Sequence, residues 1–229
     1  DSSYSDAIDI DFGNGHLNKI EIINSLNDAI DFSGSNARLH NIKINFAGDK
    51  AISVGENSEV KIKNIEISNV NYGIVSKDLS DVYVKDISIS NSFYGFGVYQ
   101  KKSEFGPGKL KAESINLIND IHAVSLKNNK DKFDSIDKIN DQSTKIIVKL
   151  DSKEELQAKS TFFYSRIFTT ENLDAYEALK SGNIDLVLLN KKELNKLILK
   201  HTDLIELPID IELPNFVEKN SVLEISLND

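Results

Sequence analysis

The sequence predicts a mainly β protein: a right-handed parallel β-helix with 22-residue coils, followed by a small α/β unit. The first observation is a small residue that returns every 22 positions, at Ala7, Ala29, Ala51, Gly73 and Gly95. The second is the alternation of apolar residues after each of them, which is the period-two pattern of a half-buried strand. Because so short a unit cannot close a core alone, we expect copies to stack at about 4.8 Å per coil.

Each coil is expected to contain two strands joined by polar corners. The first follows the small residue, as in "DAIDFS" and "KAISVG", and the second occurs as "NKIEII", "HNIKIN", "KNIEIS" and "KDISIS". The second strand places two isoleucines of each coil on one face, while Asn, Ser, Gly and Asp fill the corners. No apolar stripe of period 3.6 accompanies the repeat, so helical and leucine-rich repeats are disfavoured.

Two details of the stack are predicted from the spacing. Asn14, Asn36, Ser58 and Ser80 are expected to form a ladder at one corner, with side chain bonded to side chain up the stack. The first strand is expected to continue at "IHAVSL" (121–126), with six extra residues looping out within "YQKKSEFGPGKLKAE".

The pattern changes after the last predicted coil. We divide the chain into a β-helix (1–127), a polar linker or irregular coil (128–144) and a small α/β unit with a strand-like tail (145–229). Within the last part, "TKIIVKL", "TFFYSRIF" and "NIDLVLL" are predicted strands and "NKKELNKLILKH" a helix. "TTENLDAYEALKSG" is a helix N-capped by Thr169 or Thr170 and ended at Gly182.

Composition limits the partners. A net charge of −9 and a pI near 5.0 argue against nucleic acid and anionic membranes, which bind basic surfaces. There is no Cys, so neither disulfides nor thiolate metal sites exist, and no run of eighteen apolar residues predicts a membrane span. Because Met is also absent, we expect an excised segment or a processed chain, so the missing signal segment does not exclude secretion.

Three stretches on consecutive coils, "GDKAISVGENSEV", "GIVSKDLSDV" and "VYQKKSEFGPG", resemble the β-helical region of large bacterial surface proteins and of proteins that carry spore-coat-H-like (CotH) kinase domains. The resemblance covers about residues 5–120 and implies a pectin-lyase-like fold at the cell surface or outside the cell, without assigned catalytic residues. Within 145–211, "AYEALKSGNIDLVLL" is similar to a lobe of a bacterial solute-binding protein. That stretch is too short to carry a function.

Stacking also brings charged residues together along one flank. One column contains Glu56 and Asp78, the next contains Lys77, and Lys102 lies beside them. Such a group is what a polysaccharide lyase or epimerase would use, with Lys77 abstracting the proton α to a uronate carboxylate. The alternative is a solvated ladder of ion pairs at a coil corner, which performs no chemistry.

Two further groups remain open between ligand binding and structure. Asp9 and Asp31 stack outward and are a candidate calcium site, the alternative being a charged edge that discourages end-to-end association. Tyr72, Tyr94 and Tyr99, with Phe93 and Phe105, are a candidate sugar-stacking face or aromatic packing at corners. No cofactor other than calcium is predicted.

These observations lead to a functional prediction in two forms. The first is a structural or carbohydrate-interacting module of a secreted or cell-surface bacterial protein, whose partner is a polysaccharide or a component of the cell envelope. The alternative is a polysaccharide lyase or epimerase acting on a uronate-containing glycan. The sequence does not decide whether the chain is an enzyme.

Overall fold

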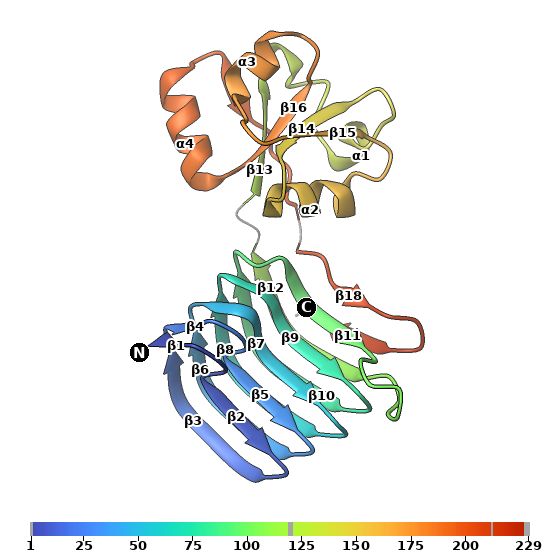
Figure 1. The fold of residues 1–229 in the computed structure, drawn as a ribbon. Coiled ribbons are helices and arrows are strands. Elements are labelled where there is room, and N and C mark those ends of the chain that lie inside the picture. Colours follow the sequence, from blue (N-terminus) through green and yellow to red (C-terminus); the bar gives the residue numbers. More distant parts are fainter. Residues whose placement is uncertain (1, 119–120, 212, 227–229) are drawn as a thin grey trace. The chain divides into compact units, whose positions relative to one another are not determined.

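The chain folds into two compact units (Figure 1). The computed structural model describes residues 2–118, 121–211 and 213–226. Unit 1 contains Asp1–Ile118 together with Leu213–Asp229, and unit 2 contains Asn119–Glu212. Within the described residues, no helix is long and apolar enough to cross a membrane.

Unit 1 is a stack of parallel strands, as the 22-residue repeat predicts. One sheet, sheet A, contains the first strand of each coil and, in the first two coils, a short strand that precedes it. Its strands are β1 (Ser2–Ser3), β2 (Ile8–Asp11), β4 (Asn24–Ser25), β5 (Ile30–Ser33), β7 (Ala47–Gly55), β9 (Val70–Lys77), β11 (Tyr94–Tyr99) and β18 (Phe216–Val217). Sheet B contains the second: β3 (Asn14–Ile22), β6 (Asn36–Ile44), β8 (Glu59–Ser68), β10 (Asp81–Ser90), β12 (Lys109–Ile118) and β19 (Val222–Ser226). This arrangement confirms the predicted mainly β fold with stacked parallel coils.

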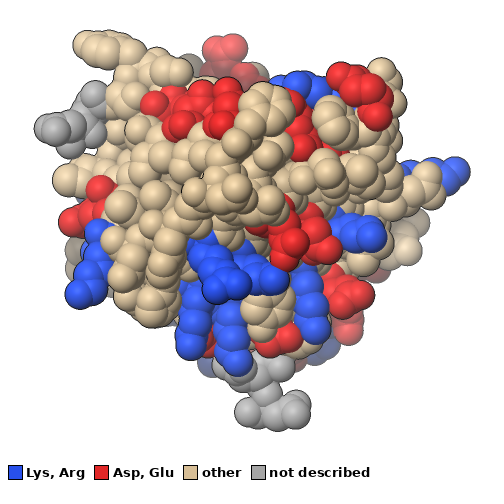
Figure 2. Space-filling model, turned by 90° about the horizontal axis from the view of Figure 1, so that it is seen from below, with Lys and Arg blue, Asp and Glu red and all other residues tan. Residues whose placement is uncertain are grey.

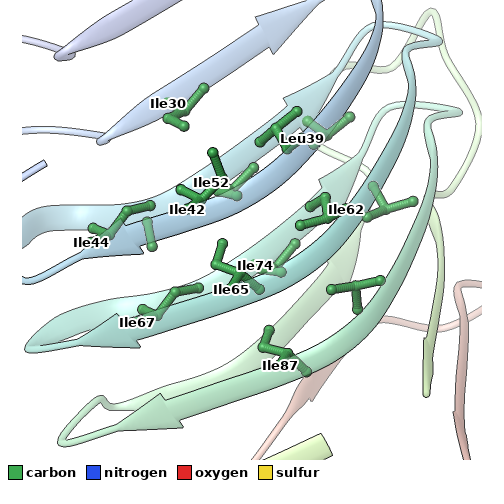
Figure 3. Packing of buried hydrophobic residues seen from close by; sticks show 14 of the residues in the cluster. Ile30, Leu39, Ile42, Ile44, Ile52, Ile62, Ile65, Ile67, Ile74 and Ile87 are labelled. Carbon is green, nitrogen blue, oxygen red and sulfur yellow. The ribbon is translucent and has the colours of Figure 1, made fainter. Parts of the chain in front are cut away.

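The core of unit 1 contains aligned columns of isoleucines from the inner faces of both sheets, together with Val, Leu, Ala and Phe side chains (Figure 3). In sheet A, Ile30, Ile52 and Ile74 pair in register and all three side chains are fully buried. In sheet B, Ile65 occupies the equivalent place between Ile42 and Ile87. Each such side chain stabilises the fold by roughly 1.5–3 kcal/mol through burial, so the repeat is held together mainly by these apolar columns.

The corner ladder differs from the predicted one. Asn36 pairs with Glu59 rather than with Ser58. The reason is that the corner at Glu56 contains a second left-handed residue, Asn57, whereas the preceding corner has only Gly34 in this conformation. The serine that follows each corner instead bonds to the backbone of the preceding coil: Ser58 Oγ accepts from Ser35 N at 2.9 Å, and Ser80 Oγ from Ser58 N at 3.1 Å.

A ladder of amide side chains runs along sheet B at a left-handed position. Asn64 Nδ2 donates to Asn41 Oδ1 at 2.6 Å, and Asn41 Nδ2 donates to Asn18 Oδ1 at 3.2 Å. Asn41 and Asn64 have φ values of 57°, a conformation that asparagine tolerates better than most residues. This ladder of Asn18, Asn41 and Asn64 is not the one predicted from the sequence, which consists of Asn14, Asn36, Ser58 and Ser80.

The prediction that "IHAVSL" continues the first strand is wrong. This segment is β13 (Ile121–Leu126), and it pairs antiparallel with β16 (Leu186–Asn190) and β17 (Leu204–Glu206) in unit 2. Its place in the β-helix is taken by β18, where Phe216 pairs with Gly97. The apolar alternation of residues 121–126 suits a strand in either sheet, so the pattern alone does not select the partner.

Unit 2 is inserted into the β-helix rather than following it. Val222 of β19 pairs with Lys109 of β12, 113 residues earlier in the chain. In the preceding coil, three residues connect β10 to β11. If three residues also replaced the 94 residues of unit 2, the spacing between Lys109 and Val222 would return to 22 residues. The C-terminal tail is therefore the missing part of the last coil, interrupted in the sequence by a second folded unit.

Unit 2 is a doubly wound α/β unit built on a five-stranded sheet, sheet C, with the order β15-β14-β16-β13-β17. Its remaining elements are η1 (Lys127–Asn129), α1 (Ile136–Ile139), β14 (Lys145–Lys149), α2 (Lys153–Thr161), β15 (Arg166–Thr170), α3 (Ala175–Lys180) and α4 (Lys191–Lys200). One face of sheet C packs against α1 and α2, and the opposite face packs against α3 and α4.

Several local predictions in this unit need correction. Residues 128–144, predicted as a polar linker, contain η1 and α1 and bury Phe133 and Ile139 in the core. Thr169 and Thr170 lie in β15, and the residue that caps α3 is Asp174. The N-terminal half of "TFFYSRIF" is not strand, since α2 extends to Thr161.

Candidate functional site

The strand order of sheet C creates a crevice at the carboxyl ends of β14 and β16. The chain moves from β14 through α2 to β15 on one side, then returns through α3 to β16 on the other side of β14. The two connections pack on opposite faces of the sheet, because Ala158 and Leu179 lie in different core clusters. In open α/β sheets, ligands bind at such a topological switch point.

A pocket with a volume of about 730 Å³ lies at this point. The end of β14 and the start of α2 form one wall, the loop between β15 and α3 forms a second, and α4 forms a third. The lining residues are Lys149, Leu150, Asp151, Ser152, Glu154, Glu171, Asn172, Leu173, Asp174, Ala175, Leu189, Asn190, Glu193, Lys196, Leu197 and Lys200. The volume lies within the range of small-molecule sites.

Local sequence explains why two helices start at the pocket. Ser152 comes three residues after the end of β14, and Asn190 is the last residue of β16. Both adopt extended backbone conformations, which suits the N-cap position. Ser152 Oγ accepts a hydrogen bond from Glu155 N at 3.2 Å, and Asn190 Oδ1 accepts one from Glu193 N at 3.0 Å. The positive ends of the α2 and α4 dipoles therefore lie at this rim.

The pocket contains lysines that no carboxylate neutralises. Lys149, Lys196 and Lys200 line it, and none makes an ion pair within 4.0 Å with a carboxylate of the described residues. By contrast, Glu154 and Glu193 both accept hydrogen bonds from the Asn190 amide, at 3.3 and 2.9 Å. The pocket therefore has unpaired positive groups beside carboxylates held in place by an asparagine.

The residues predicted as catalytic in the β-helix do not form one cluster. Lys102 Nζ donates to Glu56 Oε1, a hydrogen bond that lowers the pKa of Glu56 and raises that of Lys102. Asp78 is fully buried, and its Oδ1 accepts from the backbone N–H groups of Lys101 and Lys102 at 2.6 and 2.7 Å. These three residues thus hold the loop after β11 against the corner.

Lys77 lies apart from them, on the outer face of sheet A. Its side chain is nearly buried, and Nζ donates to Ser53 Oγ at 2.8 Å. Its positive charge makes a minor contribution to the lowered pKa of Glu56. The catalytic role predicted for Glu56, Lys77, Asp78 and Lys102 stays a prediction.

The candidate metal residues pair as expected. Asp9 in β2 lies beside Asp31 in β5 in the parallel register. Partial burial and the charges of Asp11, Asp31 and Asp6 raise the pKa of Asp9. No group of three or more His, Asp or Glu side chains among the described residues could hold a metal ion, and calcium binding stays a prediction.

Four aromatic residues of sheet A, Tyr72, Tyr94, Tyr99 and Phe216, form a cluster on its outer face. Tyr72 and Tyr94 stack with ring centroids 4.8 Å apart, and Phe216 contacts Tyr72, Tyr94 and Tyr99 edge-on at 5.8–6.5 Å. Phe216 could not be assigned to this cluster from the sequence, because its strand comes after the inserted unit. Elsewhere on the surface, groups of Lys and Arg lie next to groups of Asp and Glu (Figure 2).

No protein-family model and no curated protein matches the chain. Among solved structures, an ancestral cyclohexadienyl dehydratase is 21% identical, with a TM-score of 0.38, over 41% of this chain and 39% of that chain. An amino acid ABC transporter substrate-binding protein from Streptococcus pneumoniae, bound to L-arginine, is 16% identical, with a TM-score of 0.39, over 42% and 40%. The GluR0 ligand-binding core in complex with L-glutamate is 18% identical, with a TM-score of 0.35, over 40% and 41%.

The chain thus spans about two fifths of the length of these structures. They are amino-acid-binding proteins and a dehydratase rather than carbohydrate-binding β-helices. The predicted function, a structural or carbohydrate-interacting module with a polysaccharide lyase or epimerase as alternative, is corrected on this finding.

Proposed function

We propose that unit 2 binds a small zwitterionic organic molecule in the pocket at the carboxyl ends of β14 and β16. The observation that carries the proposal is the coincidence of a topological switch point with a pocket of about 730 Å³. The β14–α2 connection, the β15–α3 loop and α4 each contribute residues to this pocket, and the packing of the sheet does not by itself require them to converge there.

The charges of the pocket favour a ligand that carries both signs. The ammonium groups of Lys149, Lys196 and Lys200 are available for an anionic group, and the N-terminal ends of α2 and α4 favour negative charge nearby. The carboxylates of Glu154 and Glu193, oriented by Asn190, suit a cationic group. A purely anionic ligand would leave these two carboxylates without a cationic partner.

The experiment is calorimetric titration of the full chain with a panel of small molecules. The panel contains zwitterions (amino acids), dicarboxylates and cationic amines of similar size. We expect at least one zwitterion to bind, and the double variant Lys196→Glu/Lys200→Glu to weaken that binding by tenfold or more, since about 1.4 kcal/mol corresponds to each factor of ten.

Lys192→Glu is the matched control, because Lys192 lies on the same helix but does not line the pocket. It should leave the affinity within about twofold of the parent. Binding of dicarboxylates or amines alone would contradict the zwitterionic ligand. Equal loss in the control and the double variant would contradict the location of the site.

For unit 1, we further propose the closer assignment suggested by "GDKAISVGENSEV" and its neighbours. It is a pectin-lyase-like β-helix of the type found in bacterial surface and CotH-associated proteins, in a secreted or cell-surface location. The stacked parallel coils support this assignment in its coarse form. Surface labelling of cells that produce the protein, with a cytoplasmic protein as control, would test the location.

A further inference from the structure

The Lys77 side chain lies against Gly55 on the outer face of sheet A. Gly55 lies beside it in the register of the coils, and a Cβ atom at this glycine would lie 2.8 Å from Lys77 Cε. The absence of that Cβ lets the lysine chain lie flat against the backbone, which explains why an outward-facing lysine is only 8% exposed. In this position the amine reaches Ser53, which is fully buried.

The Lys77 amine makes no hydrogen bond to a carboxylate among the described residues. Its hydrogen bond, at 2.8 Å, is to the neutral hydroxyl of Ser53. The nearest carboxylate oxygen, Asp31 Oδ1, is 3.9 Å away, beyond hydrogen-bond distance, and this oxygen is itself buried without a hydrogen-bond partner. The two groups form a long ion pair without a hydrogen bond, and such a contact compensates only part of the cost of burying both charges.

Other charges around the amine act in both directions. Burial lowers the pKa of Lys77, and the positive charges of Lys50 and Lys101 lower it further, whereas Asp31 and Asp28 raise it. Glu56 is a further negative charge nearby. A desolvated amine beside other cations is the environment that makes a lysine nucleophilic.

Lys50, on the preceding coil, shows the contrasting arrangement. Its side chain is 11% exposed, the same fraction as the Lys77 side chain. However, Lys50 Nζ donates to Asp49 and contacts Asp28 at 3.4 Å, and these partners raise its pKa despite burial. Two equally buried lysines on one face therefore differ in how firmly they hold a proton.

We propose that Lys77 is a covalent site for small carbonyl compounds, which its amine captures as an imine. The nitrogen lone pair attacks the carbonyl carbon, the carbonyl oxygen takes up a proton, and the nitrogen loses one. The hydroxyl group of the resulting carbinolamine then takes up a proton, and its C–O bond breaks so that one water molecule leaves. A C=N bond forms, and the nitrogen loses its second proton to give the neutral imine. Asp31 Oδ1, close to the amine and without another partner, is placed to carry these protons.

The test is reductive trapping of the full-length protein with acetaldehyde and sodium cyanoborohydride at pH 7, followed by peptide mapping with mass spectrometry. We expect Lys77 to be alkylated about tenfold faster than Lys50, since equal burial removes accessibility as the explanation. Without the reductant, the Lys77 peptide should return to its unmodified mass after acid quenching. Alkylation of Lys77 at or below the rate of Lys50 would overturn the proposal.

A second variant separates reactivity from simple access. Lys101→Gln removes a positive charge that lowers the Lys77 pKa, so the amine should be protonated more and trapped more slowly at pH 7. Lys109→Gln, on sheet B, is the control and should leave the rate unchanged. If both variants were trapped equally slowly, or if Lys101→Gln were trapped at the parent rate, the positive charge of Lys101 would not control the reactivity of Lys77, and the proposal would be contradicted in this respect.

Discussion

Ile52 shows how one side chain depends on its two neighbours in the stack. It lies in register between Ile30 and Ile74, and its side chain is fully buried. We expect Ile52→Asp to destabilise unit 1 by roughly 4 kcal/mol or more, because it places an unpaired charge among isoleucines. Urea unfolding followed by circular dichroism measures this change.

Two controls define what that result means. Ile52→Val removes one methylene group and should cost about 1 kcal/mol, as deletion of a packed methylene does. Lys63→Asp changes an exposed side chain on sheet B and should stay within about 0.5 kcal/mol of the parent. If Ile52→Asp unfolds at the urea concentration of the parent, the inward register of sheet A is incorrect.

At the scale of residues, the sequence predicts which residues stack in the same column of the β-helix better than it predicts which side chains contact one another. The small and apolar positions every 22 residues place Ile30, Ile52 and Ile74 correctly. A shift of the strand register by one residue would turn these side chains to the other face of the sheet, so the apolar pattern specifies the register closely. The Ser58 ladder is displaced by one position, since a second left-handed residue in a corner leaves no signal in apolar spacing. The separation of Lys77 from Glu56 and Lys102 depends on side-chain direction within a corner, which column spacing does not contain.

At the scale of elements, local patterns predict strand and helix types but not their partners. α4 is predicted correctly from its amphipathic sequence, whereas α2 is missed because the segment Lys153–Thr161 has almost no apolar stripe. β13 has the alternation of a β-helix strand and yet belongs to sheet C. The pocket of unit 2 could not be located from the sequence, because its walls depend on strand order.

The pairing of β18 with β11 depends on one side chain in particular. Asn215 Oδ1 accepts a hydrogen bond from Phe96 N at 2.9 Å, across 119 residues of sequence. We expect Asn215→Ala to cost about 1–2 kcal/mol, because the Phe96 N–H loses its partner in a half-buried place. Hydrogen exchange of the Phe96 amide should become faster in this variant.

Asn215→Asp tests whether the acceptor oxygen is what matters. It keeps an oxygen in the same position, so exchange at Phe96 should stay slow. Equal exchange rates in the parent and in Asn215→Ala would show that the tail does not hold this edge of sheet A in solution.

At the scale of the whole molecule, the chain is one β-helix that contains a second folded unit. Each unit has its own core, since no residue is shared between the cluster of unit 1 and those of unit 2. The insertion falls between β12 and β18, at a connection that other coils make with a few residues. Insertions at such surface turns are tolerated because they leave the packed strands unchanged.

This arrangement predicts that unit 1 folds without unit 2. Replacing residues 119–212 by Asn-Ser-Asn restores the 22-residue spacing between Lys109 and Val222, so β19 should pair with β12 as before. We expect the shortened chain to show a β-type circular dichroism spectrum and one cooperative thermal transition. The full chain should retain that transition and add a second one for unit 2.

Removing the tail from Leu213 onward as well should lower the transition temperature of the shortened chain, because the edges of β11 and β12 then lose their partners. A shortened chain that is unfolded, or that melts identically with and without the tail, would show that residues 213–226 do not complete the last coil.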